Sequence, residues 1–148
     1  PLPAPVQDVV PNFYNHHVPE FISDVPGLCP PPEPYSYAVR HGDTIYLAGQ
    51  VALDDQMRVV GATLAEQGEQ IWRNIRAVLE RCGSSLADIV KVTYYLRDVR
   101  ELPEEIAIRT RLFPDGRFPA VTAIQAGALG MPGLMMEVDV IAAVGSHG

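Results

Sequence analysis

Phe118-Pro-Ala-Val-Thr-Ala-Ile-Gln125 is the stretch that decides the fold of this chain, and its composition predicts the start of a strand. A second strand is predicted from Leu134 to Val144, after a glycine-rich connection. On it, Glu137 and Asp139 stand two residues apart, so their side chains project from the same face. We expect the two strands to form a hairpin with these carboxylates beside the first strand.

The segments upstream predict an antiparallel pair and then a helix. Strands are predicted over Tyr35–Arg40 and Thr44–Gln50, joined by the turn residues His41-Gly42-Asp43, and a short strand over Arg58–Gly61. Thr63-Leu-Ala-Glu66 has the pattern of a capping box. The helix that follows has one apolar stripe at helical spacing and ends at Gly83.

Two further elements complete the order. Apolar and polar residues alternate over Ile89–Leu96, which predicts a strand with Val90, Val92 and Tyr94 on its apolar face. A second helix is predicted over Leu102–Leu112, with a proline in its first turn. The expected order, ββ(β)αβαββ, is typical of an α+β fold, a mixed sheet with two helices packed on one face.

The first part of the chain differs in composition from the rest. Residues 1–31 form a proline-rich N-terminal extension, and residues 32–148 are predicted to form one domain. The extension contains His16 and His17, which are more typical of surface residues than of ligands or bases. A proline at the N-terminus can be an amine nucleophile, but the proline-rich composition around Pro1 predicts a flexible start, which disfavours this role.

Composition limits the classes of partner. The net charge is −7 and the isoelectric point is about 4.9, so a nucleic-acid backbone would be repelled. Cys29 and Cys82 have no zinc-site spacing, and no metal is predicted. No apolar run approaches the ~18 residues of a membrane span. No signal peptide is evident, so a cytoplasmic location is expected.

Several motifs resemble the RidA family, also called YjgF, over residues from about Pro32 to Val144. They are Pro34-Tyr35-Ser36, Arg40-x-Gly-Asp43, Ile45-Tyr-Leu-Ala-Gly-Gln50, Gln67-x-x-Gln70-x-x-x-Asn74-Ile75, Val78-Leu-Glu-x-x-Gly83-x-Ser-Leu-x-Asp-Ile-Val-Lys91, Phe118-Pro-Ala120 and Glu137-Val-Asp139-x-Ile-Ala142. The resemblance implies a chorismate-mutase-like fold and a homotrimer with clefts between subunits. It also implies hydrolysis of reactive enamines and imines without a metal or organic cofactor.

The resemblance also implies roles for single residues. Tyr35 matches a tyrosine that closes the cleft, and Gly49 matches a glycine that lines it, followed by Gln50. Asp139 matches the acidic residue that handles water and protons, and Pro132 lies near the proline of the last loop. The family's carboxylate-binding arginine, however, is replaced by Val121, and Ala123 stands where cysteine is frequent.

The replacement at position 121 changes the expected substrate. Valine cannot form the bidentate grip that arginine gives a carboxylate. If the strand alternates, Val121, Ala123 and Gln125 line the cleft as an apolar wall with one amide. Glu137 and Asp139 lie nearby, their Cα atoms ~7 Å apart, and desolvation with mutual repulsion would raise their pKa values.

Two functions fit these features. The first is an enzyme that hydrolyses a C–N bond of an enamine or imine, with Asp139 activating water and Glu137 assisting; its substrate would not be a simple 2-iminocarboxylate. Three other arginines could replace the missing one, namely Arg109, Arg111 and Arg117. The second is a trimer that binds a small metabolite without chemistry. A ribonuclease role is disfavoured by the acidic composition.

Overall fold

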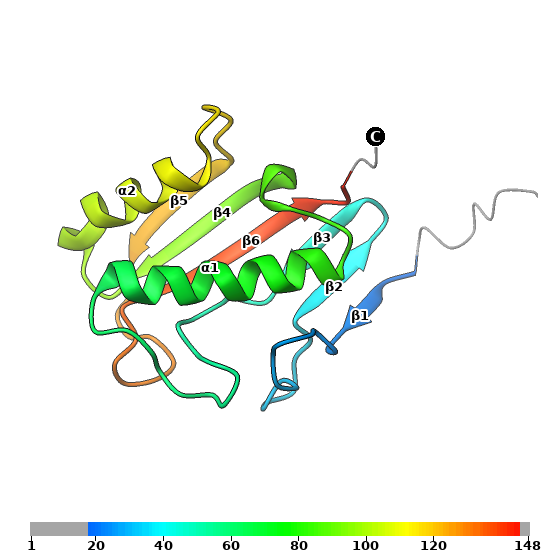
Figure 1. Cartoon of the computed structure of the whole chain (residues 1–148), viewed down its shortest axis with the longest axis horizontal. Coiled ribbons are helices and arrows are strands. Elements are labelled where there is room, and N and C mark those ends of the chain that lie inside the picture. The colour runs from blue at the N-terminus through cyan, green and yellow to red at the C-terminus, as the bar shows by residue number, and fades with distance from the viewer. Residues whose placement is uncertain (1–17, 146–148) are drawn as a thin grey trace, which may run out of the picture.

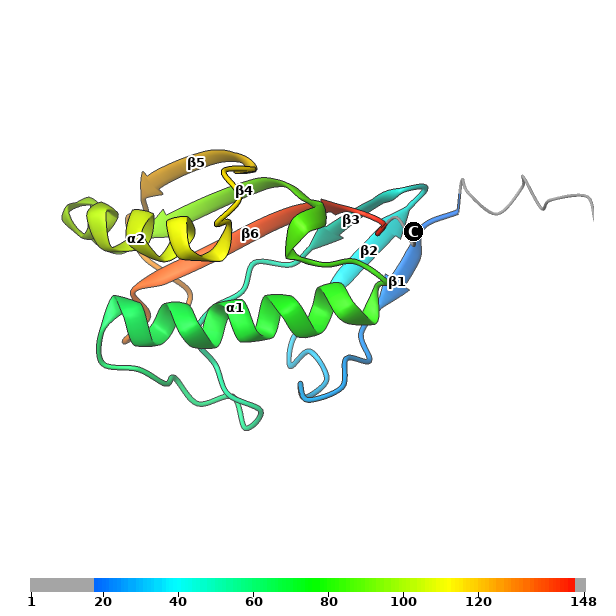
Figure 2. The same cartoon turned by 45° about the horizontal axis from the view of Figure 1, so that its top comes forward.

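The computed structural model describes residues 18–145, in which two helices cover one face of a six-stranded sheet (Figures 1 and 2). The strand order across the sheet is β1-β2-β3-β6-β4-β5. Strands β4 and β5 are parallel, and every other neighbouring pair is antiparallel. The predicted α+β class, with two helices on one face of a mixed sheet, is therefore confirmed.

The first predicted hairpin forms at the expected turn. Strand β2 runs over Ala38–His41 and β3 over Thr44–Leu47, and Gly42 between them has a φ of 62°. A positive φ in this range costs glycine little, because it has no Cβ. The turn therefore fixes the register that pairs His41 with Thr44.

Helix α1 runs over Leu64–Arg81 and begins as the capping pattern predicts. The Thr63 side chain accepts a hydrogen bond from the backbone N–H of Glu66, and the Glu66 carboxylate accepts one from the N–H of Ala62. The apolar stripe of the helix packs on the sheet, where Ile71, Ile75, Val78 and Leu79 are fully buried. The helix ends at Cys82, before Gly83 in a left-handed conformation.

Strand β4, Ile89–Leu96, has the predicted bounds but not the predicted face at its start. A register irregularity between Ile89 and Lys91 turns Val90 outward, and Val90 is 52% exposed. Ile89 takes the buried position instead. A bulge of this kind inserts one residue and inverts the alternation locally.

The predicted hairpin between the last two strands is wrong. Strand β5, Ala120–Gln125, pairs with β4 in parallel, whereas β6, Met136–Ala143, lies between β3 and β4. Helix α2, Leu102–Leu112, makes the crossover that a parallel β4-β5 pair requires. The alternating residues Met136, Val138, Val140 and Ala142 of β6 are buried beneath the helices, so a central position suits this strand better than an edge.

Two other segments differ from expectation. The predicted strand over Arg58–Gly61 is reduced to an isolated bridge between Leu53 and Val59. Conversely, Glu20–Ile22 forms β1, an edge strand within the proline-rich segment, and Ile22 is buried against the core. An edge strand tolerates flanking prolines because one side of its backbone needs no partner. Pro1, His16 and His17 lie outside the described residues.

Helix α2 is anchored by a buried ion pair. Glu105 is 1% exposed and accepts two hydrogen bonds from the Arg109 guanidinium, at 3.0 and 2.5 Å. The same guanidinium lies 5.3 Å from the centre of the Tyr94 ring on β4. Gly68 of α1 completes the packing, because a Cβ there would lie 2.9 Å from Ile108 Cδ1. The two helices therefore approach each other closely at this point.

The buried amide of Gln67 connects α1 to two loops. Its side-chain nitrogen donates to the carbonyls of Gly61 and Gly133, at 3.1 and 2.8 Å. Its side-chain oxygen accepts from the N–H of Met135 at 2.9 Å. Gln67 is 1% exposed, so water cannot replace these bonds. The amide thereby fixes the start of β6.

Replacing this amide by an apolar group is expected to destabilise the fold. Gln67→Leu removes three hydrogen bonds, to the carbonyls of Gly61 and Gly133 and from the N–H of Met135, and should lower the free energy of unfolding by about 2–4 kcal/mol. Gln70→Leu, on the same helix, removes bonds only to Asn74 and Arg73 and should cost about 1 kcal/mol. Urea denaturation measures both, and equal losses would contradict the special role of Gln67.

Candidate functional site

A cavity of about 350 Å³ lies beside the end of β3 and the start of β6, and it is the strongest candidate site. Four segments meet there: residues 32–35, 48–57, 130–134 and the start of β6. Most of its lining residues are apolar, Glu33, Tyr35 and Glu137 supply polar side chains, and the backbone of Gly49 forms part of the wall. A concave, mostly apolar pocket with few polar groups is the common form of a small-molecule site.

Gly49 and Glu137 touch each other at this site. A Cβ atom at position 49 would lie 2.5 Å from Glu137 Oε1, so any larger residue would displace the carboxylate. The contact depends on the neighbouring backbone, where Gln50 and Val138 exchange hydrogen bonds of 2.8 and 2.9 Å. This pairing aligns Gly49 with Glu137 across two segments that lie far apart in the sequence.

The environment raises the pKa of the Glu137 carboxyl. Desolvation is the larger cause, and the neighbouring charge of Asp139 is the second. The pKa of Asp139 is raised as well by desolvation, against the opposing effect of a hydrogen bond from the backbone of Val140. The predicted rise of both pKa values thus agrees with the structure. A carboxyl that keeps its proton closer to neutral pH can act as an acid or a base.

Glu137, rather than Asp139, faces the cavity. Asp139 is on the same face of β6 but one step further along, opposite Thr93 of β4, and it is not among the lining residues. Tyr35 does line the cavity and stacks edge-on against Tyr37, with ring centres 6.1 Å apart. The matched tyrosine and glycine therefore meet a carboxylate, but it is the one predicted only to assist.

The other residues predicted to bind substrate occupy different places. Gln50 is buried and does not line the cavity. Its side-chain amide donates a hydrogen bond to the carbonyl of Ala48, a lining residue, at 3.3 Å. Pro132 belongs to the 130–134 loop, whose neighbours Gly130, Met131 and Leu134 line the cavity. Sequence reasoning missed Leu53, Met57 and Met131, because nothing in the sequence shows which loops fold together at this point.

The predicted wall of Val121, Ala123 and Gln125 does not face Glu137 and Asp139 in one chain. Val121 pairs with Val92 and Ala123 with Tyr94, and both pack against the core beneath the helices. The Gln125 side chain accepts a hydrogen bond from the N–H of Val99. The residues of β5 on the carboxylate face are Ala120, Thr122 and Ile124. The error follows from the missing hairpin, because β4 separates β5 from β6.

The three alternative arginines also lie away from the cavity. Arg109 is engaged by Glu105, Arg111 lies between the two helices, and Arg117 follows α2. None of them is among the lining residues, and no Lys or Arg of residues 18–145 is. Within that range, no three His, Cys, Asp or Glu residues are grouped as a metal ion would require. No helix of the described part has the length and apolarity to cross a membrane.

Comparison with known proteins places this architecture in a family. A family model described as endoribonuclease L-PSP matches residues 29–144. The chain belongs to the RidA family. This agrees with the motifs in the sequence and with the fold: a Rid family protein from Yersinia pestis has a TM-score of 0.80 at 26% identity, covering 86% of this chain and all of that one.

Curated relatives show the range of names within the RidA family. A RutC family protein of Pyrococcus abyssi is 34% identical over 74% of this chain and 85% of its own length. A 2-iminobutanoate/2-iminopropanoate deaminase of Dermatophagoides farinae is 30% identical over 75% of this chain and 87% of its own length. At least one relative of this RidA protein is therefore named as an imine deaminase.

The contact between Gly49 and Glu137 yields a direct test. Gly49→Ala should push the carboxylate away from the wall, with a cost in stability of about 1 kcal/mol, because the end of a flexible side chain can move. The pKa of Glu137, followed by NMR, is expected to fall toward its ordinary value of 4.5 as the group becomes more hydrated. Gly127→Ala, where a Cβ meets nothing within 4 Å, is the matched control. An unchanged Glu137 pKa in Gly49→Ala would refute the contact.

Proposed function

We propose that this RidA protein is a cofactor-independent hydrolase that cleaves the C–N bond of a small imine or enamine. The observation that carries the proposal is the Glu137 carboxyl, held against Gly49 in an apolar cavity where its pKa is raised. The kinship with proteins that include a named imine deaminase supports the choice of reaction. A polar, half-buried carboxyl in such a cavity is suited to proton transfer.

The proposed reaction adds one water and releases ammonia. Protonated Glu137 gives its proton to the enamine carbon or the imine nitrogen, which makes the carbon of the C=N bond electrophilic. The resulting carboxylate then accepts a proton from the attacking water, and a new C–O bond forms. Glu137 then returns this proton to the nitrogen, and as the C–N bond breaks the hydroxyl gives its proton to Glu137, so that ammonia and a carbonyl product leave. Asp139 is proposed to support this cycle by keeping the pKa of Glu137 high.

The charge of the cavity selects the substrate. Its lining residues include two carboxylates, Glu33 and Glu137, and no cation from the described part of the chain. A carboxylate-bearing substrate would be repelled, whereas a neutral enamine or a positively charged iminium would not. We therefore propose that the substrate is not a simple 2-iminocarboxylate. A positively charged intermediate would also be stabilised by Glu137 as it forms.

The assembly is proposed to be a homotrimer with clefts between subunits. The face of the sheet opposite the helices is bare in one chain and exposes apolar residues, among them Phe21 at 70%, Tyr46 at 48% and Ile124 at 43%. A bare apolar sheet face of this kind favours burial against another subunit. Ala120, Thr122 and Ile124 of the edge strand β5 lie on this same face, so we propose that this edge approaches a neighbouring copy in the trimer. The proposed partners are copies of this chain and a small molecule, with no nucleic acid and no membrane.

Ammonia release from an imine without a carboxylate tests the reaction. Purified protein is expected to hydrolyse it faster than 2-iminopropanoate, and Glu137→Gln should lower kcat by about 10²-fold or more. The kcat/KM profile should have an inflection above pH 4.5, because the pKa of Glu137 is raised, and Glu137→Gln should lose it. Asp139→Asn removes a like charge outside the cavity and should lower kcat by less than about tenfold.

Two results would contradict this assignment. Full activity in Glu137→Gln would remove the proposed acid and base, and fastest turnover of 2-iminopropanoate would refute the substrate class. The second candidate, a trimer that binds a metabolite without chemistry, predicts binding of the same compounds with no ammonia release in either protein. The apolar wall of Leu53, Met57 and Leu134 favours binding in both cases, so turnover alone separates them.

A matched pair of substitutions tests the assembly. Ile124 lies on the bare sheet face and is 43% exposed, and Ile106 lies on α2 and is 44% exposed. Ile124→Asp should disrupt a trimer, because it would bury a charge in the interface. Ile106→Asp should not. Sedimentation of the unaltered chain is expected at three times the monomer mass of 16.2 kDa. A monomer, or equal behaviour of both variants, would contradict the proposed interface.

A further inference from the structure

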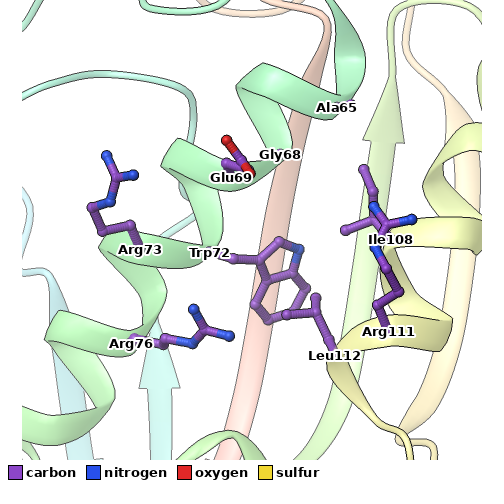
Figure 3. Close-up of a pocket in the computed structure, with 9 residues that line it drawn as sticks. All are labelled: Ala65, Gly68, Glu69, Trp72, Arg73, Arg76, Ile108, Arg111 and Leu112. Carbon is purple, nitrogen blue, oxygen red and sulfur yellow. The ribbon is translucent and has the colours of Figure 1, made fainter.

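A second cavity of about 350 Å³ lies between α1 and α2, on the opposite face of the sheet from Glu137 and Asp139 (Figure 3). Gly68, Trp72, Arg73 and Arg76 of α1 face Ile108, Arg111 and Leu112 of α2 across it. The α1 residues recur at three- and four-residue spacing, so they form one side of the helix. This cavity takes no part in the reaction proposed above.

Trp72 forms the base of the cavity and leaves one donor unused. Its side chain is 2% exposed, and the ring is fixed by an edge-on contact with Phe113, with centres 6.2 Å apart. The indole N–H is buried and has no hydrogen-bond acceptor among residues 18–145. In Figure 3 the ring nitrogen points toward the gap between the two helices. Buried donors are nearly always paired, so this one indicates an acceptor that residues 18–145 do not provide.

Three arginines, Arg73, Arg76 and Arg111, line the same cavity in a chain whose net charge is −7. Arg73 donates to the amide oxygen of Gln70 at 2.9 Å, which leaves its charge uncompensated. The side chains of Arg76 and Arg111 have no partner within the described residues, and both are exposed. Glu69 is the one carboxylate among the lining residues. Arginine forks of this kind recognise carboxylate and phosphate groups.

We propose that this cavity binds a small organic anion with a flat apolar part. Arg76 and Arg111, from opposite sides, hold its carboxylate or phosphate group, and the apolar part lies on Trp72 and Leu112. An oxygen of the ligand accepts a hydrogen bond from the indole N–H. The arginine side chains can donate hydrogen bonds to a carboxylate or to a phosphate in the same way. The ligand class is therefore a small molecule with one anionic group attached to an aromatic or aliphatic part.

The single tryptophan of the chain reports on this cavity directly. Purified protein is titrated with phenyl phosphate and, separately, with benzoate, while the fluorescence of Trp72 is followed. A saturable change is expected with at least one anion, and the tighter of the two identifies phosphate or carboxylate as the preferred group. Benzyl alcohol has the ring without the charge, and it should cause no saturable change at the same concentrations.

Arginine variants decide whether the anionic group is recognised. Arg76→Gln and Arg111→Gln should each raise the dissociation constant about tenfold, because each removes one charge-assisted hydrogen bond to the anion. Arg58→Gln, an exposed loop arginine paired with Asp54, is the matched control and should bind as the unaltered protein does. In the unaltered protein, raising the ionic strength from about 0.01 to 0.15 M should weaken binding, because the Debye length falls from about 30 to 8 Å.

Three outcomes would overturn the proposal. They are no saturable change with either anion, an equal response to benzyl alcohol, and an affinity that depends neither on salt nor on Arg76 and Arg111. Because the salt titration uses the unaltered chain, the test remains decisive even if a variant fails to fold.

Discussion

The central position of β6 is the constraint on which the rest of this structure depends. Its backbone pairs with β4 along most of its length and with β3 at one end, and beyond β3 the pairing continues through Gln50 and Val138. This continuation is what aligns Gly49 with Glu137. Because alternate residues of a strand face opposite sides, the same strand supplies the buried core on one face and two carboxylates on the other. The start of β6 is in turn fixed by the buried amide of Gln67, so the core and the candidate site share one support.

The two faces of the sheet have separate chemistry. The face without helices has carboxylates with raised pKa values and an apolar cavity free of cations, which suits proton transfer to a neutral or cationic substrate. On the helix face, three arginines line the same cavity as a tryptophan whose buried indole N–H has no acceptor among the described residues. An acidic protein that concentrates arginine in one groove creates a local field opposite in sign to its net charge. The close approach of α1 and α2 at Gly68 and Ile108 shapes that groove, and the buried Glu105–Arg109 pair anchors α2 beside it.

Local patterns in the sequence predicted the elements well, since both helices and the strand Ile89–Leu96 follow from periodicity and capping. The pairing of the strands was harder to predict from the sequence. The last two strands follow one another after a short loop, and a hairpin was the simplest expectation, yet β4 lies between them. That one error in pairing placed Val121 and Ala123 beside the two carboxylates, whereas in one chain both residues pack against the core. Pairing depends on burial of both faces of a strand, which no local window contains.

The sequence by itself determined the family, the α+β class, the capped helix after Thr63 and the absence of an arginine at position 121. These features rest on residue identity and short spacing, so they can be recognised before the chain is folded. Tertiary structure alone decided which carboxyl faces a cavity, why position 49 is glycine and where the arginines of α1 and α2 gather. Each of these depends on atoms from segments far apart in the chain. The distances between these atoms are set by the packing of the whole sheet and its helices, because a close-packed interior allows each buried side chain only one arrangement.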